Sequence, residues 1–385
     1  MEKVRVGVIG VGSMGTSHVN YLVEGKIEGA ILTALLEQRL DKKEELERCY
    51  PGIQIFQDEE LFFKQAEVDA VLIATPHYDH PRLASKAFEH QMHVLTEKPA
   101  GVYTKQVRRM NEAAKESGKV FSIMYNQRTN PLYQKVRDLI QTKELGDIRR
   151  INWIMTSWYR SQSYYDSGDW RATWAGEGGG VLINQCPHQL DLWQWMTGMM
   201  PAKIRSFCSF GKYRDIEVED EVTAYAEYEN GATAVFITTT AEAAGTNRLE
   251  IVGEQGKIVV EHGTLTFWRL RISEPEFNRT YKGGFGEPEY WKCEIPIIRT
   301  KEGHEVITQN FIDAIRLNTP LLAPGEEGIK GLMISNAIQL STWINDSVEF
   351  PLDEKLYYEQ LQKRIQQSKS KVIKGYRTLN VEGTH

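Results

Sequence analysis

Near its N-terminus the chain reads Val4-Arg5-Val6-Gly7-Val8-Ile9-Gly10-Val11-Gly12-Ser13-Met14-Gly15. The β-branched run before Gly10 predicts a buried strand, and the residues after Gly15 can continue as a helix. Gly10 permits a tight turn, Gly12 lets the backbone approach a pyrophosphate, and Gly15 lets the helix pack closely on the strand. Strand, glycine turn and helix together predict a dinucleotide site, with the anion at the helix N-terminus.

An acidic residue stands where such a site needs one. Glu37 ends the apolar run Ala30 to Leu36 and lies about 20 residues beyond Gly15. Its carboxylate can bond the ribose hydroxyls, and its charge disfavours the 2′-phosphate of NADP. We therefore expect NAD as the cofactor. The alternative is a glycine-rich turn that binds no ligand.

Strand and helix signals alternate over residues 1–125, which predicts an α/β domain with a doubly wound parallel sheet. In such sheets ligands bind at the carboxyl ends of the strands. Thr75, Glu97 and Asn126 fall at or just past predicted strand ends. We expect them to converge with the glycine turn and Glu37 on one crevice.

The pattern changes from residue 126 onwards. A helix is expected at Pro131 to Gly146. Runs of β composition then follow one another, with a single helix expected among them at His188 to Thr197 and a hairpin turn at Asn230-Gly231. This predicts an α+β domain over residues 126–352, with a large, mostly antiparallel open sheet covered by helices on one face. Two later helices are expected at 304–317 and 326–345. Residues 353–385 predict a charged helix, Asp353 to Lys371, and a tail that we expect to be mobile after Gly375.

Composition narrows the classes of function. A length of 385 residues favours two domains, and 52 acidic against 46 basic residues give a net charge of −6. This balance favours neither a nucleic-acid partner nor an anionic membrane surface. The four cysteines form no CxxC pair, and His77 and His80 lack acidic or thiol partners, so we expect no metal site. No apolar run reaches transmembrane length and no signal segment precedes the first strand, so we expect a cytoplasmic protein.

Lys98 is the first candidate for chemistry. It stands in Glu97-Lys98-Pro99, directly after a predicted strand and beside the expected crevice. A lysine there can lower the pKa of a substrate hydroxyl through its charge, or relay its proton. The alternative is a solvated surface lysine.

His188 is the second candidate. It follows three glycines, Gly178 to Gly180, which can permit close approach of the backbone to a ligand. Pro187 suits the first turn of a helix, so Asn184 lies near the helix start and His188 in its first turn. Asp191 lies three residues further on the same helix face and could orient the imidazole. Near neutral pH a histidine can accept and donate a proton. The alternative is a histidine that only caps or packs.

A stretch rich in aromatic side chains and arginine separates these candidates, and it comprises Trp158, Tyr159, Arg160, Tyr164, Tyr165, Trp170, Arg171 and Trp174. Aromatic faces accept the C–H faces of sugars, and arginine holds hydroxyls or anions. We expect Trp170 and Arg171 to bind an uncharged or weakly anionic carbohydrate. The alternative for each aromatic residue is core or interface packing.

These features together resemble the Gfo/Idh/MocA family of nicotinamide-dependent oxidoreductases, over nearly the whole chain to about residue 352. The motifs that carry the resemblance are the glycine turn at 10–15, Thr75 to His80, Glu97-Lys98-Pro99, Asn126-Gln127-Arg128, Gly178 to Asp191, Asn310 to Arg316, and Gly325 to Gly328. The resemblance implies a Rossmann domain and a second domain whose open sheet often mediates oligomers. It also implies hydride transfer at a secondary alcohol, usually of a sugar or cyclitol.

The resemblance places Lys98 and His188 in the catalytic positions. The residues expected to bind the cofactor are Gly10, Gly12, Ser13, Met14, Gly15, Glu37, Thr75, His80, Glu97, Lys98 and Asn126. Those expected to bind the substrate are Lys98, Trp170, Arg171, Asn184 and His188. Many family members carry an aspartate in place of Asn184, and an asparagine can hydrogen-bond but cannot take a proton. The version seen here resembles a branch that acts on sugars or sugar derivatives.

We therefore expect an NAD-dependent dehydrogenase that oxidises a sugar, glycoside or cyclitol and forms homo-oligomers. His188 accepts the hydroxyl proton, Lys98 polarises the oxygen and Asn184 holds a nearby hydroxyl. Two alternatives stay open: an enzyme that cleaves glycosides through a transient oxidation, and a non-catalytic dinucleotide or sugar sensor. The first would release an aglycone without net NADH. The presence of both Lys98 and His188 argues against the second.

Overall fold

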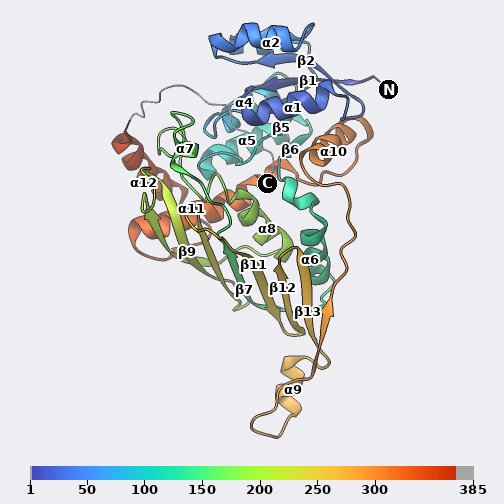
Figure 1. Cartoon of the computed structure of the whole chain (residues 1–385), viewed down its shortest axis with the longest axis vertical. Coiled ribbons are helices and arrows are strands. Elements are labelled where there is room, and N and C mark those ends of the chain that lie inside the picture. The colour runs from blue at the N-terminus through green and yellow to red at the C-terminus, as the bar shows by residue number, and fades with distance from the viewer. Residues whose placement is uncertain (1, 370–385) are drawn as a thin grey trace.

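A computed structural model describes residues 2–369 of the chain (Figure 1). Its strands form two sheets, one of six strands and one of nine. The tail after Gly375 and the last residues of the helix expected at Asp353 to Lys371 lie outside the described residues. No helix within 2–369 is long and apolar enough to cross a membrane.

The first sheet is the predicted doubly wound parallel sheet. Its strands are β1 (Val4–Ile9), β2 (Ala30–Leu36), β3 (Gln54–Phe56), β4 (Ala70–Ile73), β5 (His93–Thr96) and β6 (Phe121–Ile123). They lie in the order β3-β2-β1-β4-β5-β6, and every pair is parallel. The helices between them are α1 (Ser13–Val23), α2 (Lys43–Cys49), α3 (Glu59–Gln65), α4 (Asp79–Glu89) and α5 (Thr104–Ser117), with the short η1 (Leu40–Lys42) before α2. This strand order is that of the Rossmann fold, so the prediction is confirmed.

The glycine turn joins β1 to α1 in the expected way. Gly10 has a φ of +87°, which favours glycine. A Cβ on Gly15 would lie 1.9 Å from the carbonyl oxygen of Gly10, so only glycine lets α1 pack this closely. A Cβ on Gly12 would meet no atom within 4 Å. Gly15 therefore serves helix packing, whereas Gly12 faces open space.

The second sheet is mostly antiparallel, as expected. Its strands are β7 (Ile148–Met155), β8 (Lys203–Phe210), β9 (Glu219–Glu227), β10 (Thr233–Thr239), β11 (Asn247–Gly253), β12 (Gly256–Glu261), β13 (Thr264–Leu270), β14 (Tyr290–Glu294) and β15 (Val348–Glu349). They lie in the order β14-β13-β12-β11-β7-β10-β9-β8-β15, and only β7 and β10 pair in parallel. The hairpin predicted at Asn230-Gly231 joins β9 and β10. The edge strands β14 and β15 were not predicted.

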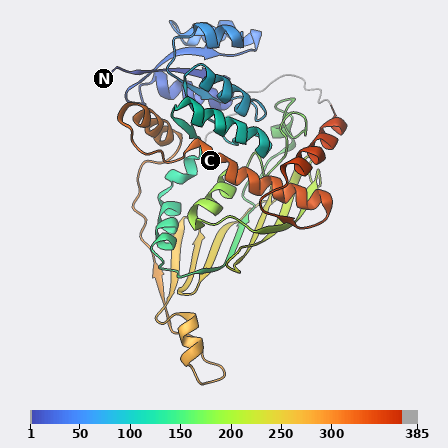
Figure 2. The ribbon, with the colours of Figure 1, turned by 180° about the vertical axis from the view of Figure 1, so that it is seen from behind.

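Helices cover one face of this sheet. In β9, Val222, Ala224 and Ala226 are buried, whereas Thr223 and Tyr225 alternate with them and are exposed. The larger helices of this part of the chain are α6 (Pro131–Gln141), α8 (Pro187–Thr197), α11 (Gly328–Ile344) and α12 (Glu354–Gln367). Its shorter helices are α7 (Gln162–Tyr165) and α9 (Glu274–Thr280). The arm that carries α9 lies at the end of the molecule farthest from the parallel sheet (Figures 1 and 2).

After β14 the chain returns to the first sheet. Helix α10 (His304–Leu317) packs beside β1 and β5. The following segment runs along β6, where Ile123 N donates to Ala323 O at 3.1 Å and Ser122 Oγ donates to the same oxygen at 2.9 Å. Short η3 (Gly325–Glu327) then leads into α11. The two sheets are thus connected by more than one passage of the chain.

A buried ion pair links the segment just past β6 to helix α8 and to η3. Arg128 lies in η2 (Asn126–Thr129), just past β6, and its side chain is fully buried. Its Nε and one terminal nitrogen donate to both carboxylate oxygens of Asp191 at 2.7 and 2.6 Å, and its other terminal nitrogen reaches Glu327 at 2.5 Å. The expectation that Asp191 orients His188 is therefore wrong, because this carboxylate is bonded to Arg128.

We predict that Arg128→Met destabilises the protein strongly, because it leaves Asp191 buried without its counter-charge. Breaking a buried pair in this way costs about 3–5 kcal/mol of the free energy of unfolding, measurable by urea denaturation. The double variant Arg128→Met/Asp191→Leu removes both charges and should regain most of that stability. A double variant as unstable as the single one would contradict this account.

We also predict that two glycines of the turn respond differently to alanine. Gly15→Ala forces the backbone apart and should lower the free energy of unfolding by about 1–3 kcal/mol. The methyl group of Gly12→Ala would contact no other atom, so the free energy of unfolding of this variant should change by less than about 0.5 kcal/mol. Its affinity for NADH should fall. Urea denaturation and titration of NADH fluorescence measure the two effects. Unchanged NADH affinity in a folded Gly12→Ala protein would show that the cofactor does not approach this residue.

Candidate active site

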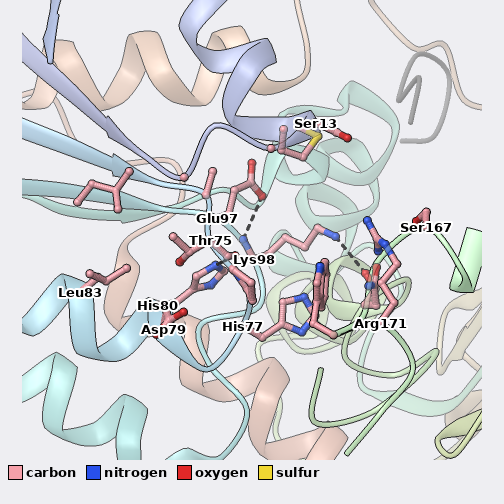
Figure 3. Close-up of a pocket in the computed structure, with 18 of the residues that line it drawn as sticks. Ser13, Thr75, His77, Asp79, His80, Leu83, Glu97, Lys98, Ser167 and Arg171 are labelled. Atoms are coloured by element: carbon pink, nitrogen blue, oxygen red, sulfur yellow. Dashed lines mark hydrogen bonds between the residues drawn. The ribbon is translucent and has the colours of Figure 1, made fainter. Parts of the chain in front are cut away.

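A cavity of about 720 Å³ opens at the carboxyl ends of the parallel strands, between the two domains (Figure 3). Of the predicted site residues, the first domain contributes Gly10, Gly12, Ser13, Met14, Glu37, Thr75, His80, Glu97 and Lys98 to its wall. The second domain contributes Trp170, Arg171, Asn184 and His188. Gly15 and Asn126 do not line it. The structure thus brings nearly all the predicted residues to one place, as the strand-end rule requires.

The glycine turn and Glu37 suit a dinucleotide. Helix α1 has no side chain capping its N-terminus, so its first backbone N–H groups are available to a pyrophosphate. The open space beside Gly12 leaves room for that group. Glu37 is buried, and its two oxygens accept from the backbone N–H groups of Val11 and Arg39, both at 3.1 Å. These bonds fix the carboxylate beside the turn, where it can accept hydrogen bonds from the ribose hydroxyls.

His80 and Asn126 make structural contacts. The two ring nitrogens of His80 lie 2.7 Å from the carbonyl oxygens of Thr75 and Pro99. Burial lowers the pKa of His80, and these backbone contacts oppose that shift. The ring thus braces the loops that follow β4 and β5. The Asn126 amide nitrogen lies 3.4 Å from His304 Nδ1, in the interior.

Lys98 reaches from the first domain to the second. Its Nζ donates to the backbone oxygen of Asn184 at 3.0 Å (Figure 3). Burial lowers the pKa of the Lys98 ammonium, and the negative charge of Glu97 opposes this. Glu97 is itself 2.8 Å from His18 Nε2, and although burial acts in the opposite direction, this contact holds the pKa of Glu97 below its usual range. Lys98 is therefore not a solvated surface lysine.

Asn184 is held by a buried carboxyl group that sequence reasoning missed. Its amide nitrogen donates to Glu177, while its oxygen accepts from the hydroxyl of Tyr164 at 3.3 Å. Glu177 also accepts from the backbone N–H of Ala172 at 2.5 Å. Burial raises the pKa of Glu177, and the charge of Arg171 opposes this. The only signal for Glu177 in the sequence was its place just before the glycine run.

His188 lies in the first turn of α8, buried, with its ring 6.2 Å from that of Tyr125. The glycines before it serve the fold and not a ligand, which corrects our expectation. A Cβ on Gly180 would lie 2.1 Å from the backbone oxygen of Glu219, and one on Gly179 would lie 2.6 Å from the Gln339 side chain. The Glu219 carboxylate also accepts from the N–H of Gly180 at 2.9 Å. This close packing sets the start of α8.

The aromatic stretch divides into two groups. Tyr165 and Trp174 are buried, so core packing explains them. Tyr164 and Trp170 line the cavity, where the Arg171 guanidinium lies 4.6 and 4.5 Å from their rings. An Arg171 nitrogen also donates to the Tyr164 hydroxyl at 2.9 Å. Within residues 2–369 no group of three or more His, Cys, Asp or Glu side chains is arranged to hold a metal ion.

Comparison with known proteins identifies relatives of both parts of the chain. Residues 4–125 match the model of an oxidoreductase family with an NAD-binding Rossmann fold, and residues 133–259 match the GFO/IDH/MocA C-terminal domain. The chain is 28% identical to the rhizopine catabolism protein MocA of Rhizobium meliloti over 53% of this chain and 61% of that protein, less than two thirds of its length. It is 22% identical to myo-inositol 2-dehydrogenase of Thermotoga maritima over 88% of this chain and 96% of that protein.

A solved structure also resembles the whole fold. The WlbA dehydrogenase of Chromobacterium violaceum, crystallised with NADH and UDP-GlcNAcA, superposes with a TM-score of 0.78 at 25% identity, over 92% of this chain and 97% of that one. The family models cover both domains, and the predicted resemblance is confirmed. The chain belongs to the Gfo/Idh/MocA family of oxidoreductases and uses NAD as its cofactor.

Proposed function

We propose that this protein oxidises a secondary hydroxyl of a sugar, glycoside or cyclitol to a ketone. The observation that carries the proposal is that Lys98, Asn184 and His188 line the same cavity as the glycine turn and Glu37. A proton acceptor, a cation and a hydrogen-bonding amide thus lie beside a dinucleotide site. The relatives support this class of substrate, since one is named for myo-inositol and WlbA was crystallised with a sugar nucleotide.

In the proposed oxidation each side chain at the site has a separate role. Bound NAD supplies the hydride acceptor at its nicotinamide ring. His188 takes the proton of the reacting hydroxyl, and the Lys98 ammonium stabilises the negative charge that develops on that oxygen. Asn184 and Tyr164 hold a neighbouring hydroxyl. The contact of Lys98 with the Asn184 carbonyl points the ammonium toward the second domain.

We predict that Lys98→Met and His188→Ala each lower kcat by about 10²–10⁴-fold on a confirmed substrate, since this is the usual contribution of general acid–base groups. Because both act on one proton, the losses should not add in the double variant. NADH affinity, measured by fluorescence titration, should stay within a few-fold. Lys105→Met, on the exposed surface of α5, is the matched control and should behave as the unmodified protein.

Three results would overturn this assignment. Near-normal turnover by Lys98→Met would show that the ammonium takes no part in the chemistry. Tight NADH binding without oxidation of any alcohol, by the unmodified protein, would favour the sensor. Release of an aglycone from a glycoside without net NADH would identify the glycoside-cleaving alternative.

We further propose that the protein forms homo-oligomers through the uncovered face of the nine-stranded sheet. That face exposes Phe207 by 64% and Tyr225 by 40%, on the neighbouring strands β8 and β9. Large exposed apolar side chains on a sheet of this size favour a protein partner.

We predict that light scattering at low concentration shows a multiple of the 44.1 kDa chain, and that the double variant Phe207→Arg/Tyr225→Arg shifts it toward the monomer. The two substitutions put charge where the partner would have to bury it. A monomer in the unmodified protein would contradict the proposal.

A further inference from the structure

Two arginines face one tyrosine at the substrate end of the cavity. The guanidinium of Arg160 lies 5.1 Å from the centre of the Tyr164 ring, and that of Arg171 lies 4.6 Å from it. Each also lies near a tryptophan, with 5.6 Å between Arg160 and Trp158 and 4.5 Å between Arg171 and Trp170. All five side chains line the cavity. Aromatic rings thus hold two guanidinium groups at one wall.

Neither guanidinium is paired with a carboxylate among residues 2–369. Their hydrogen bonds go to uncharged oxygens, from Arg160 to the backbone oxygen of Tyr159 and from Arg171 to the hydroxyl of Tyr164, both at 2.9 Å. Arginines elsewhere differ: Arg5 pairs with Asp69, and Arg82 pairs with Glu59. The two cavity arginines therefore keep N–H groups for another acceptor.

The nearby carboxyl groups offset only part of this charge. Glu177 is turned toward the Ala172 backbone and the Asn184 amide, and burial raises its pKa. Asp169 lines the cavity but is an exposed residue, where solvent screens it. Lys98 adds a third cation. The substrate end thus carries an excess of positive charge in a partly enclosed space, which attracts anions.

We propose that the substrate carries an anionic group, a carboxylate or a phosphate, which Arg160 and Arg171 bind while Lys98 and His188 act on a hydroxyl. The planar guanidinium presents N–H groups in a fork that matches the two oxygens of either anion. This inference rests on the proposed function and names the substrate class for that site.

The position of the arginines separates this role from cofactor binding. The pyrophosphate has its own donors at the start of α1, in the first domain. Figure 3 shows Lys98 in the middle of the cavity, with Thr75, His80 and Leu83 to one side and Arg171 and Ser167 to the other. Arg171 thus lies on the second-domain side of the ammonium.

Matched ligands test the proposal. D-glucose, D-glucuronate and D-glucose 6-phosphate share one ring, and the last two supply the carboxylate and phosphate arms. We would measure kcat/KM with NAD and, separately, binding to the complex with NADH by quenching of tryptophan fluorescence, since Trp158 and Trp170 line the site. We expect at least one anion to be favoured over glucose by about 10–100-fold in affinity. The stronger anion identifies the group that the site binds.

Variants assign that preference to the arginines. Arg160→Gln and Arg171→Gln should each lower the ratio of anion to glucose affinity by about 10-fold or more. Arg171→Lys keeps the charge but loses the planar fork, so it should retain part of the ratio. Arg109→Gln, an exposed residue of α5, is the matched control and should keep the full ratio.

Each contrary result is distinguishable. No preference for either anion in the unmodified protein, or an unchanged ratio in both glutamine variants, would overturn the inference while leaving the proposed dehydrogenase intact. A loss of NADH affinity with an unchanged ratio would assign the arginines to the cofactor. Anion-selective binding without turnover of any sugar or cyclitol would support the anion site and contradict the proposed function instead.

Discussion

The site depends on the buried pair between Arg128 and Asp191. Lys98 comes from the end of β5 and His188 from α8, so any movement between the domains would change the distance between the two groups. Arg128 follows β6 and is bonded through two nitrogens to Asp191, which lies one helical turn beyond His188. A charge pair in the interior tolerates little displacement, because separation leaves each charge without solvent or partner. The ion pair thus holds α8 against the segment that directly follows β6, the last strand of the parallel sheet.

The contact of Lys98 with Asn184 completes this arrangement from the other side. An ammonium whose pKa is lowered by burial needs acceptors, and the Asn184 carbonyl supplies one at 3.0 Å. The chain between them includes the glycine run, whose tight packing on Glu219 fixes where α8 begins. Lys98 is therefore positioned by a contact that crosses the boundary between the domains, and the start of α8, with His188, by the ion pair just past that boundary.

Local patterns predicted the parallel sheet and most of the cavity wall. The glycine turn needs only its own residues, and the strand-end rule places Thr75, Glu97 and Lys98 at one edge without knowledge of distant contacts. The same reasoning failed for Asp191, because helical spacing shows which residues share a face but not which distant segment meets that face. Arg128 belongs to the motif Asn126-Gln127-Arg128, yet nothing in the sequence links it to the carboxylate of Asp191.

The sequence also does not show the role of the glycine run, the two edge strands or the burial of Glu177. The glycines at 178–180 indicated a close approach, but the sequence could not tell a ligand from the Glu219 strand. Edge strands β14 and β15 are short or carry mostly exposed side chains, so they lack the alternation that marks a half-buried strand. Glu177 escaped notice because a buried carboxyl group cannot be told from a solvated one by its neighbours in sequence.

Glu177 also bears on the charge of the site. The family resemblance implies an aspartate where this chain has Asn184, and here the Asn184 amide nitrogen donates to the carboxylate of Glu177. The amide can still bond a hydroxyl, but the negative charge is removed from the surface that Lys98 and Arg171 share. Burial lowers the pKa of the Lys98 ammonium, and the charges of Glu97 and Glu177 oppose this shift. A bound anion would oppose this shift, since it favours the charged ammonium. The anionic substrate proposed above would thus favour the charged ammonium that stabilises the developing negative charge, with His188 as the group that takes the proton.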